Sequence, residues 1–244
     1  MHAKKTLILI RVLVVILFVM FLAFKMAQSF SKTAAEDFTV RGVDISSHQG
    51  WIDWEKFSEN DLDFAFIKAT EGSTFKDKFY NSNIKGIQNT DIVPGAYHFL
   101  SFESDGKSQA ENFISSVDAK SISLPPVIDL ELYGEYNKKP PSNAKVREIL
   151  DEMIPRLYEE YGRYPIIYTN RRAYALYVSG AYENCDIWIC DLKKIPSLPD
   201  GRKWTFWQYS HTETLTGYAG GEAYVDMNVF SGSEEEFEEY IKKP

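Results

Sequence analysis

Cysteine and histidine are scarce in this chain, and acidic residues outnumber basic ones. The 244 residues include two cysteines and four histidines, and the formal net charge is −8. Cys185 and Cys190 lie five residues apart, so within one strand their side chains point to opposite faces. We therefore expect two packed free thiols rather than a disulfide, which would need local distortion. An acidic body lacks the basic footprint that nucleic acids require, which argues against nucleic acid as a partner.

Internal repeats, low-complexity stretches and zinc-type spacings of Cys and His are also missing from the sequence. Hydrophobic residues make up 44% of the chain and aromatic residues 15%, which is enough for a core and excludes a disordered protein. The length suits one α/β barrel, a fold that takes about 250 residues. Composition and length together predict one folded domain.

A long apolar run stands at the N-terminus. Val12–Phe24 is 13 apolar residues that follow the basic start MHAKK, and the run reaches back to Leu7 with only Arg11 interrupting it. Its length falls between the core of a signal peptide and a membrane-spanning helix of about 20 residues. The sequence therefore predicts an exported protein whose N-terminus starts on the cytoplasmic side.

Residues 1–37 are predicted to be a signal peptide or a signal anchor that ends in a short linker, Ser31–Asp37. Cleavage, for which small residues such as Ala27 and Ser29 are suitable, would give a secreted or periplasmic protein. Without cleavage, residues 7–24 would anchor the chain in the membrane. Either way, residues 38–244 form the predicted catalytic domain.

Strand-like and helix-like stretches alternate after this leader. The predicted strands are Thr39–Ile45, Phe64–Ala69, Ile92–Phe99, Pro126–Glu131, Pro165–Thr169, Asp186–Cys190, Thr205–Tyr209 and Tyr224–Val229. The predicted helices are Lys107–Val117, Ala144–Tyr161, a short one near Arg171–Tyr177 and an acidic tail capped by Ser233. Such alternation predicts a parallel sheet with crossover helices, and eight strands predict an irregular closed (β/α) barrel.

Four acidic residues stand at the ends of predicted strands, namely Asp44, Asp129, Glu131 and Asp226. A carboxylate that closes an apolar run is costly to bury unless it is paired or used. Because the active sites of such barrels lie at the C-terminal ends of the strands, we expect these acids to meet in one cleft.

The pair Asp129 and Glu131 has the spacing that glycoside cleavage needs. Residues two apart in a strand lie on the same face, with Cβ atoms about 7 Å apart. One carboxylic acid can then protonate the leaving oxygen, while the other carboxylate stabilises positive charge at the sugar carbon. Repulsion in a poorly solvated cleft would raise the pKa of one member. Taken alone, the D-x-E pattern also fits a solvated or salt-bridged strand end.

Further sequence blocks accompany these acids. They are VRGVDISSHQG at 40–50, FIKATEG at 66–72, GAYHF at 95–99, PVIDLE at 126–131, IYTN at 167–170, WQYS at 207–210 and VDMN at 225–228. In order and spacing they closely resemble the family 25 glycoside hydrolases, which are lysozymes that act as N-acetylmuramidases on peptidoglycan. The resemblance runs from about residue 40 to residue 230, and its most specific parts are the D-I-x-x-x-Q-G and K-A-T-E-G blocks.

The resemblance implies hydrolysis of the β-1,4 bond between N-acetylmuramic acid and N-acetylglucosamine in peptidoglycan strands, without a metal or other cofactor. It implies Glu131 as the general acid and Asp129 as the partner that stabilises the intermediate, with Asp44 and Asp226 completing an acidic floor. It also implies retention of configuration with the substrate's acetamido group as nucleophile. The spacing of the acids by itself leaves retention and inversion open.

Six residues are predicted to contact the sugars, and they are Tyr97, Phe99, Tyr168, Trp207, Gln208 and Tyr209. Large aromatic residues are also common in barrel cores, so packing is the alternative role. Lys68 and Glu71 are expected to pair with each other near the cleft. His98 alternates with Tyr97 and Phe99, so we expect it to face away from them rather than bind a metal.

The sequence thus predicts an exported, monomeric lysozyme. Two other classes of protein are compatible with the sequence. A catalytically inactive glycan-binding protein on the same barrel would have no reason to retain four costly acids. A metal-dependent polysaccharide hydrolase or deacetylase would lose its activity in EDTA.

Overall fold

The strands close into a barrel. In the computed structural model the backbone is described for residues 2–243, and the side chains for residues 10–22, 25–26 and 29–243. The barrel strands are β1 (Arg41–Ile45), β2 (Phe64–Glu71), β4 (Val93–Phe99), β5 (Val127–Leu130), β6 (Ile166–Asn170), β7 (Ile187–Cys190), β8 (Phe206–Glu213) and β9 (Val225–Phe230). Their order around the sheet is β1-β9-β8-β7-β6-β5-β4-β2, and a β1–β2 pairing closes the ring. The short strand β3 (Phe75–Lys76) pairs with the end of β2. All eight predicted strands are confirmed.

Strand β9 departs from the predicted parallel arrangement, because it runs antiparallel to both β8 and β1. The other neighbouring pairs around the ring are parallel. A parallel connection needs a crossover of a dozen or more residues, usually a helix. Residues 214–224, which join β8 to β9, contain no helix, so the chain turns back directly. This reversal places the start of β9 beside the C-terminal ends of the other strands.

Alternate side chains of each strand point into the barrel, and their character changes along its axis. Four aromatic residues pack together inside the barrel at the N-terminal ends of its parallel strands, namely Phe64, Phe66, Trp188 and Phe206. Within this cluster Phe66 and Trp188 stack with ring centroids 4.4 Å apart. Further along the same inward faces, polar residues such as Lys68, Asp44, Asp129 and Asp226 replace the aromatic ones and line a cavity. The alternation of side chains therefore builds an apolar layer at one end of the barrel interior and a polar cavity at the other.

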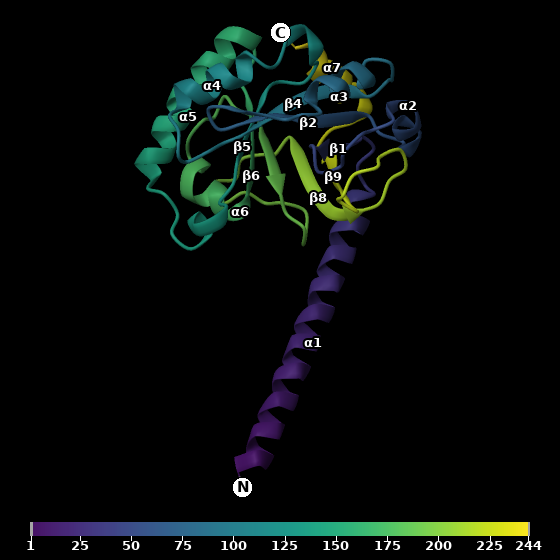
Figure 1. Cartoon of the computed structure of the whole chain (residues 1–244), viewed down its shortest axis with the longest axis vertical. Helices are drawn as coiled ribbons and strands as arrows, with labels where there is room; N and C mark the ends of the chain where they lie inside the picture. The colour runs from purple at the N-terminus through teal and green to yellow at the C-terminus, as the bar shows by residue number, and fades with distance from the viewer. Residues whose placement is uncertain (1, 244) are drawn as a thin grey trace.

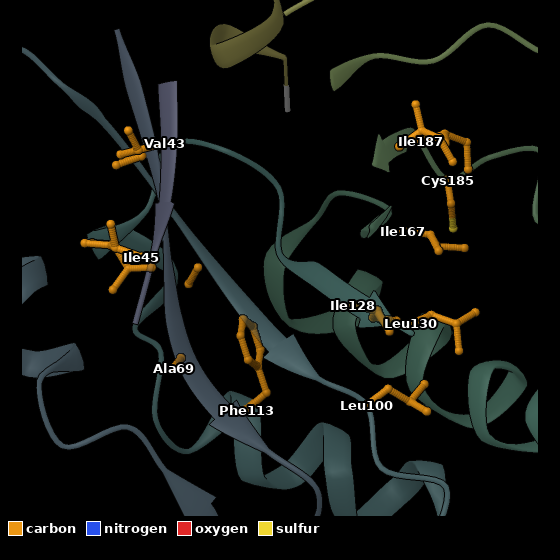
Figure 2. Packing of buried hydrophobic residues seen from close by; sticks show 14 of the residues in the cluster. Val43, Ile45, Ala69, Leu100, Phe113, Ile128, Leu130, Ile167, Cys185 and Ile187 are labelled. Atoms are coloured by element: carbon orange, nitrogen blue, oxygen red, sulfur yellow. The ribbon is translucent and has the colours of Figure 1, made fainter. Parts of the chain in front are cut away.

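The outward side chains form a second, larger core against the helices. It contains Val43, Ile67, Ile128, Leu130 and Ile167, all fully or almost fully buried. Figure 2 shows part of this layer, including Cys185 among the aliphatic side chains. The covering helices are α2 (Trp54–Phe57), α3 (Tyr80–Ile87), α4 (Gly106–Ile114), α5 (Asn143–Tyr161) and α6 (Arg171–Ala173), with short turns of other helix types at Ser58–Asn60, Ala119–Ser121, Gly134–Asn137 and Tyr174–Val178.

Both cysteines are free thiols, as predicted. Cys185 is buried in the outer core, whereas Cys190 lies on the inward face of β7 together with Trp188. Their side chains therefore belong to opposite sides of the barrel wall, which is why no bridge joins them.

Helix boundaries follow the capping residues of the sequence. Ser142 caps α5 by accepting a hydrogen bond from the Lys145 N–H, and Gly162 ends that helix with φ of 69°. The closing helix α7 (Glu234–Lys242) begins with a capping box between Ser233 and Glu236. Phe237 and Tyr240 of α7 pack on Phe206 and Phe230, so this helix seals the apolar end of the barrel.

The N-terminal helix α1 (His2–Ala35) runs away from the barrel as a single rod (Figure 1). Its last turns pack beside β8, where the Ser31 hydroxyl donates to the Leu192 and Tyr209 carbonyls and Lys32 forms an ion pair with Glu213. Residues 31–35, which belong to the predicted short linker, are thus helical and contact the folded body.

Within the described residues, no helix is long and apolar enough to cross a membrane. Residues 7–9 and 23–24 of the predicted anchor lie outside the side chains that the structure describes. The membrane anchor stays a prediction.

We expect Gly42→Ala to destabilise the barrel at its closure. A Cβ atom at Gly42 would lie 2.5 Å from both the Phe64 ring atom Cε2 and the Phe64 carbonyl oxygen, so β1 and β2 would have to separate. The expected loss in the free energy of unfolding is about 1–3 kcal/mol, measured by urea denaturation. Gly221→Ala is the control, since nothing lies within 4 Å of its added Cβ. Equal stability of the two variants would contradict this account of the closure.

Candidate active site

The four predicted acids meet at one end of the barrel. Asp44 lies near the end of β1, Asp129 on β5, and Glu131 one residue beyond β5. Asp226 lies at the start of the reversed strand β9, directly opposite Asp44 in the β1–β9 register. The predicted meeting of the acids is confirmed, although Asp226 reaches the site through the reversal of β9 rather than at the end of a parallel strand.

A cavity of about 210 Å³ holds all four acids. Its lining consists of Asp44, Ser46, His48, Lys68, Tyr97, Phe99, Asp129, Glu131, Tyr168, Trp188 and Asp226. An adjoining hollow of about 250 Å³ shares Asp44 and Asp226 and extends toward His211, Glu222 and Tyr224. A larger hollow of about 640 Å³ lies at the opposite end of the barrel against α7, but none of the four acids lines it. The acid-lined cavity is therefore the candidate active site.

Two amide side chains hold Asp44. Gln208 Nε2 and Asn228 Nδ2 both donate to Asp44 Oδ2, at 2.9 Å and 2.8 Å. Gln208 Nε2 also donates to Asp226 Oδ2 at 3.2 Å. Burial raises the pKa of Asp44 to about 6, while the two amide donors limit the rise. Burial and the charge of Asp44 raise the pKa of Asp226 to about 8, so the facing carboxyl groups ionise in different pH ranges.

Asp129 and Glu131 form a second pair of perturbed acids. Burial raises the pKa of Asp129 well above its usual range, and the charge of Glu131 raises it further. Burial also raises the pKa of Glu131, against the effect of the hydrogen bond that Asn170 Nδ2 donates to it at 3.4 Å. Two close carboxyl groups with poor solvation do not both ionise near neutral pH, so this pair retains a proton.

Lys68 balances part of this negative charge. Its ammonium group lies 2.7 Å from Glu71 Oε2 and 4.9 Å from the centre of the Phe99 ring, and its charge lowers the pKa of Asp129. The predicted ion pair with Glu71 is confirmed. Because Lys68 also lines the cavity, it acts on the acids in addition to pairing with Glu71.

The structure separates the six predicted sugar-contacting residues into two groups. Tyr97, Phe99 and Tyr168 line the cavity, where a sugar could reach them. Trp207 and Tyr209 do not, because they lie on the outward face of β8, where both are buried in the outer core and Trp207 Nε1 donates to the Asp191 carbonyl. The position of these two residues does not support the predicted sugar contact.

Gln208, between them, points inward, but its polar groups are engaged by the protein. Its side chain is 4% exposed, its amide nitrogen donates to two acids, and its carbonyl oxygen accepts from Tyr168 Oη at 2.8 Å. It therefore supports the site rather than offering hydrogen bonds to a sugar.

His98 faces away from the cavity, as its alternation with Tyr97 predicts. It is fully buried outside the barrel, with Thr70 Oγ1 at 2.7 Å and Gln109 Oε1 at 3.0 Å from its ring nitrogens. Among the residues that the structure describes, no three or more His, Cys, Asp or Glu side chains are arranged to hold a metal ion.

Trp188 and Asn228 also belong to the site, although neither is among the predicted site residues. Trp188 forms part of the cavity wall, and its indole N–H donates to Asn228 Oδ1 at 2.8 Å. The signal was available, because Trp188 alternates with Cys190 in IWIC, and Asn228 stands two residues after Asp226.

Most glycoside hydrolases cleave sugar chains with a protonated carboxyl group beside a carboxylate, and this cavity holds such a pair. This chain is such an enzyme. The profile of the glycosyl hydrolases family 25 matches residues 43–218, and the chain belongs to that family.

Individual relatives agree with this assignment. The chain is similar to the solved family 25 glycosyl hydrolase from Bacillus anthracis, with 48% identity, a TM-score of 0.79, and coverage of 84% of this chain and 94% of the other. It is 32% identical to Lysozyme M1 of Streptomyces globisporus over 80% of this chain and 68% of the relative. It is 28% identical to the N,O-diacetylmuramidase of Arthroderma benhamiae over 84% and 87% of the two chains.

We expect Lys68→Met to raise the pKa of Asp129 further. The ammonium group favours the charged carboxylate, so its removal moves the ionisation of Asp129 to higher pH. The measurement is a pH titration of ¹³C-labelled aspartate side chains by NMR, with the Asp129 signal assigned from Asp129→Asn. Lys68→Arg should restore most of the shift. Lys76→Met, which changes an exposed lysine on β3, is the control. An Asp129 titration unchanged by Lys68→Met would refute the electrostatic role of Lys68.

Proposed function

We propose that this enzyme is a lysozyme that hydrolyses the β-1,4 bond between N-acetylmuramic acid and N-acetylglucosamine in peptidoglycan, with Glu131 as general acid. The observation that carries the proposal is the perturbed Asp129–Glu131 pair in the tyrosine-lined cavity. The family match and the lysozyme and muramidase relatives support peptidoglycan as the substrate class.

Asp129 has a free acceptor for the substrate. Its Oδ1 atom is buried and has no hydrogen-bond partner among the described residues. A buried carboxylate oxygen without a donor is costly, so a substrate group that donates there gains a strong hydrogen bond. The N–H of an N-acetyl group beside the cleaved bond is such a donor. This match favours an N-acetylated sugar at the position next to Asp129.

Substrate binding would also settle which member of the pair carries the proton. An N–H donated to Asp129 stabilises the carboxylate and lowers its pKa, and Lys68 acts in the same direction. The retained proton then resides on Glu131, whose pKa burial raises. Glu131 is thereby prepared to protonate the glycosidic oxygen while Asp129 stays charged.

The reaction would proceed in two steps with retention of configuration. Glu131 gives its proton to the leaving oxygen as the C1–O bond breaks, and the acetamido oxygen bonds to C1 while Asp129 holds the acetamido N–H. Water then attacks C1, gives its proton to Glu131 and releases the acetamido oxygen. An NMR time course in which the inverted anomer forms first would refute this course.

Tyr97 and Tyr168 would frame the reacting sugar. Both rings line the cavity, and burial together with the neighbouring acids raises the pKa of each hydroxyl well above its usual range. They stay neutral at working pH and supply apolar ring surface, which suits contact with a sugar face.

The proposed substrate lies outside the cytoplasm, so the proposal includes export of the enzyme. The family assignment agrees with an exported protein.

We expect Glu131→Gln to lower turnover at least about 100-fold, because it removes the acid that protonates the leaving group while preserving the size of the side chain. The full-length protein is incubated with purified peptidoglycan, and new reducing ends are identified by mass spectrometry after borohydride reduction. Reduced muramic acid ends are expected with the unaltered enzyme.

Glu135→Gln is the control, since Glu135 is an exposed glutamate four residues further along the chain, and its activity should be unchanged. Reduced glucosamine ends would place the cleavage at the other bond. Loss of activity in EDTA would indicate a metal-dependent hydrolase. Tight binding to wall material with no new ends would identify an inactive glycan-binding protein.

A further inference from the structure

We infer that Gln208 is a positioning residue which, with Asn228, keeps Asp44 as the charged member and Asp226 as the protonated member of the facing carboxyl pair. The consequence for catalysis rests on the proposed function. The assignment of charge to Asp44 and of the proton to Asp226 depends only on contacts within the protein, so it can be tested without substrate.

The direction of the hydrogen bonds starts at Trp188. An indole N–H can only donate, so the atom of Asn228 that lies 2.8 Å from Trp188 Nε1 must be the amide oxygen. The amide nitrogen of Asn228 then faces Asp44, 2.8 Å from Oδ2. This chain of atoms fixes Asn228 as a donor to Asp44, since the opposite orientation of the amide would place two donors against each other.

Gln208 adds a second donor with a fixed orientation. Its amide nitrogen lies 2.9 Å from Asp44 Oδ2 and 3.2 Å from Asp226 Oδ2, while its oxygen accepts from the Tyr168 hydroxyl at 2.8 Å. Both amide hydrogens and the amide oxygen are thus used. Gln208 has no hydrogen left for a sugar, and its effect on the reaction passes through the acids and Tyr168.

The two acids receive unequal support. One oxygen of Asp44 accepts two amide hydrogen bonds below 3 Å, whereas Asp226 accepts one, at 3.2 Å. Amide donors favour a carboxylate over a carboxylic acid, so charge settles on Asp44 and the proton on Asp226. The carboxyl groups also share a hydrogen bond, in which the protonated Asp226 donates to Asp44.

Other ionisable groups surround this pair from each neighbouring element. They are Tyr97 on β4, Asp129 and Glu131 at the end of β5, Tyr168 on β6, Cys190 on β7 and Glu222 in the loop before β9. His48 and His211 line the adjoining hollow, and Lys68 on β2 lines the cavity. Glu131 raises the pKa of both Asp44 and Asp226, whereas Glu222 raises that of Asp226. The effect of Glu222 therefore has the same direction as that of the unequal amide contacts.

The division of charge has a consequence for the reaction. With one proton shared between Asp44 and Asp226, this pair contributes one negative charge to the cavity in which positive charge develops at the sugar carbon.

The first test is a titration of the free, full-length protein. Aspartate side chains are labelled with ¹³C, and Asp44→Asn and Asp226→Asn assign the two signals. We expect Asp44 to ionise near pH 6 and Asp226 near pH 8, so that at pH 7 only Asp44 is charged. Ionisation of Asp226 before Asp44, or of both together, would overturn the inference.

The second test removes the amide group of Gln208 that donates to Asp44. Gln208→Met retains the length of the side chain but no strong hydrogen-bonding group, and we expect the Asp44 titration to move up by about one pH unit. The pH dependence of kcat/KM should move in the same direction. Gln109→Met is the matched control, since this buried glutamine bonds His98, Ser101 and Ser104 and touches none of the acids. A normal Asp44 titration in folded Gln208→Met would refute the positioning role.

The two proposals fail separately. A protein with the expected order of titration that does not cleave peptidoglycan would refute the proposed function and leave the charge assignment intact. An active lysozyme in which Gln208→Met leaves both the Asp44 titration and the pH profile unchanged would refute only the role of Gln208.

Discussion

The pleat of a closed barrel governs this structure. Each strand must turn every second side chain into an interior that water barely reaches, so an acid on that face needs a partner or a use. At the end of the barrel near α7, the inward side chains are apolar rings such as Phe66 and Trp188, which need no polar partner. At the other end the inward acids have amide partners, since Gln208 and Asn228 lie one layer deeper in the barrel and donate to Asp44. Trp188 links the two layers, because its ring stacks on Phe66 and its N–H donates to Asn228, which in turn donates to Asp44.

The reversal of β9 is what completes the chamber. In a uniformly parallel barrel, a residue at the start of the last strand would lie at the end away from the active site. Because β9 runs the other way, Asp226 lies opposite Asp44 in the register, and Asn228 follows on the same inward face. One short strand thus supplies an acid and the amide that holds the acid facing it. The last turns of α1 pack near the same end of β8, so the N-terminal helix joins the body on the side of the active site.

Much of the site could be predicted from the strands because alternation is a local property. Parity alone places Asp129 and Glu131 on one face and turns His98 away from Tyr97. The same rule shows why two of the residues predicted to contact sugars do not line the cavity. Trp207, Gln208 and Tyr209 are consecutive, so they cannot all face the cavity, and the structure turns only Gln208 inward. Aromatic character indicates that a residue is buried or binds a ligand, but it does not indicate the side of the wall on which it lies.

Local sequence patterns were enough to predict the eight barrel strands and the inward faces of most of them, because these depend on neighbours within a few residues. The helix caps at Ser142 and Ser233 and the acids that end the strands are local in the same way. Tertiary structure decided the direction of β9, the packing of Ser31 against β8, and the contacts that give Asp44 and Asp226 different pKa values. Those features join residues more than 150 positions apart, such as Asp44 with Gln208 and Asn228. A pKa set by burial and by such partners exists only once the barrel has closed.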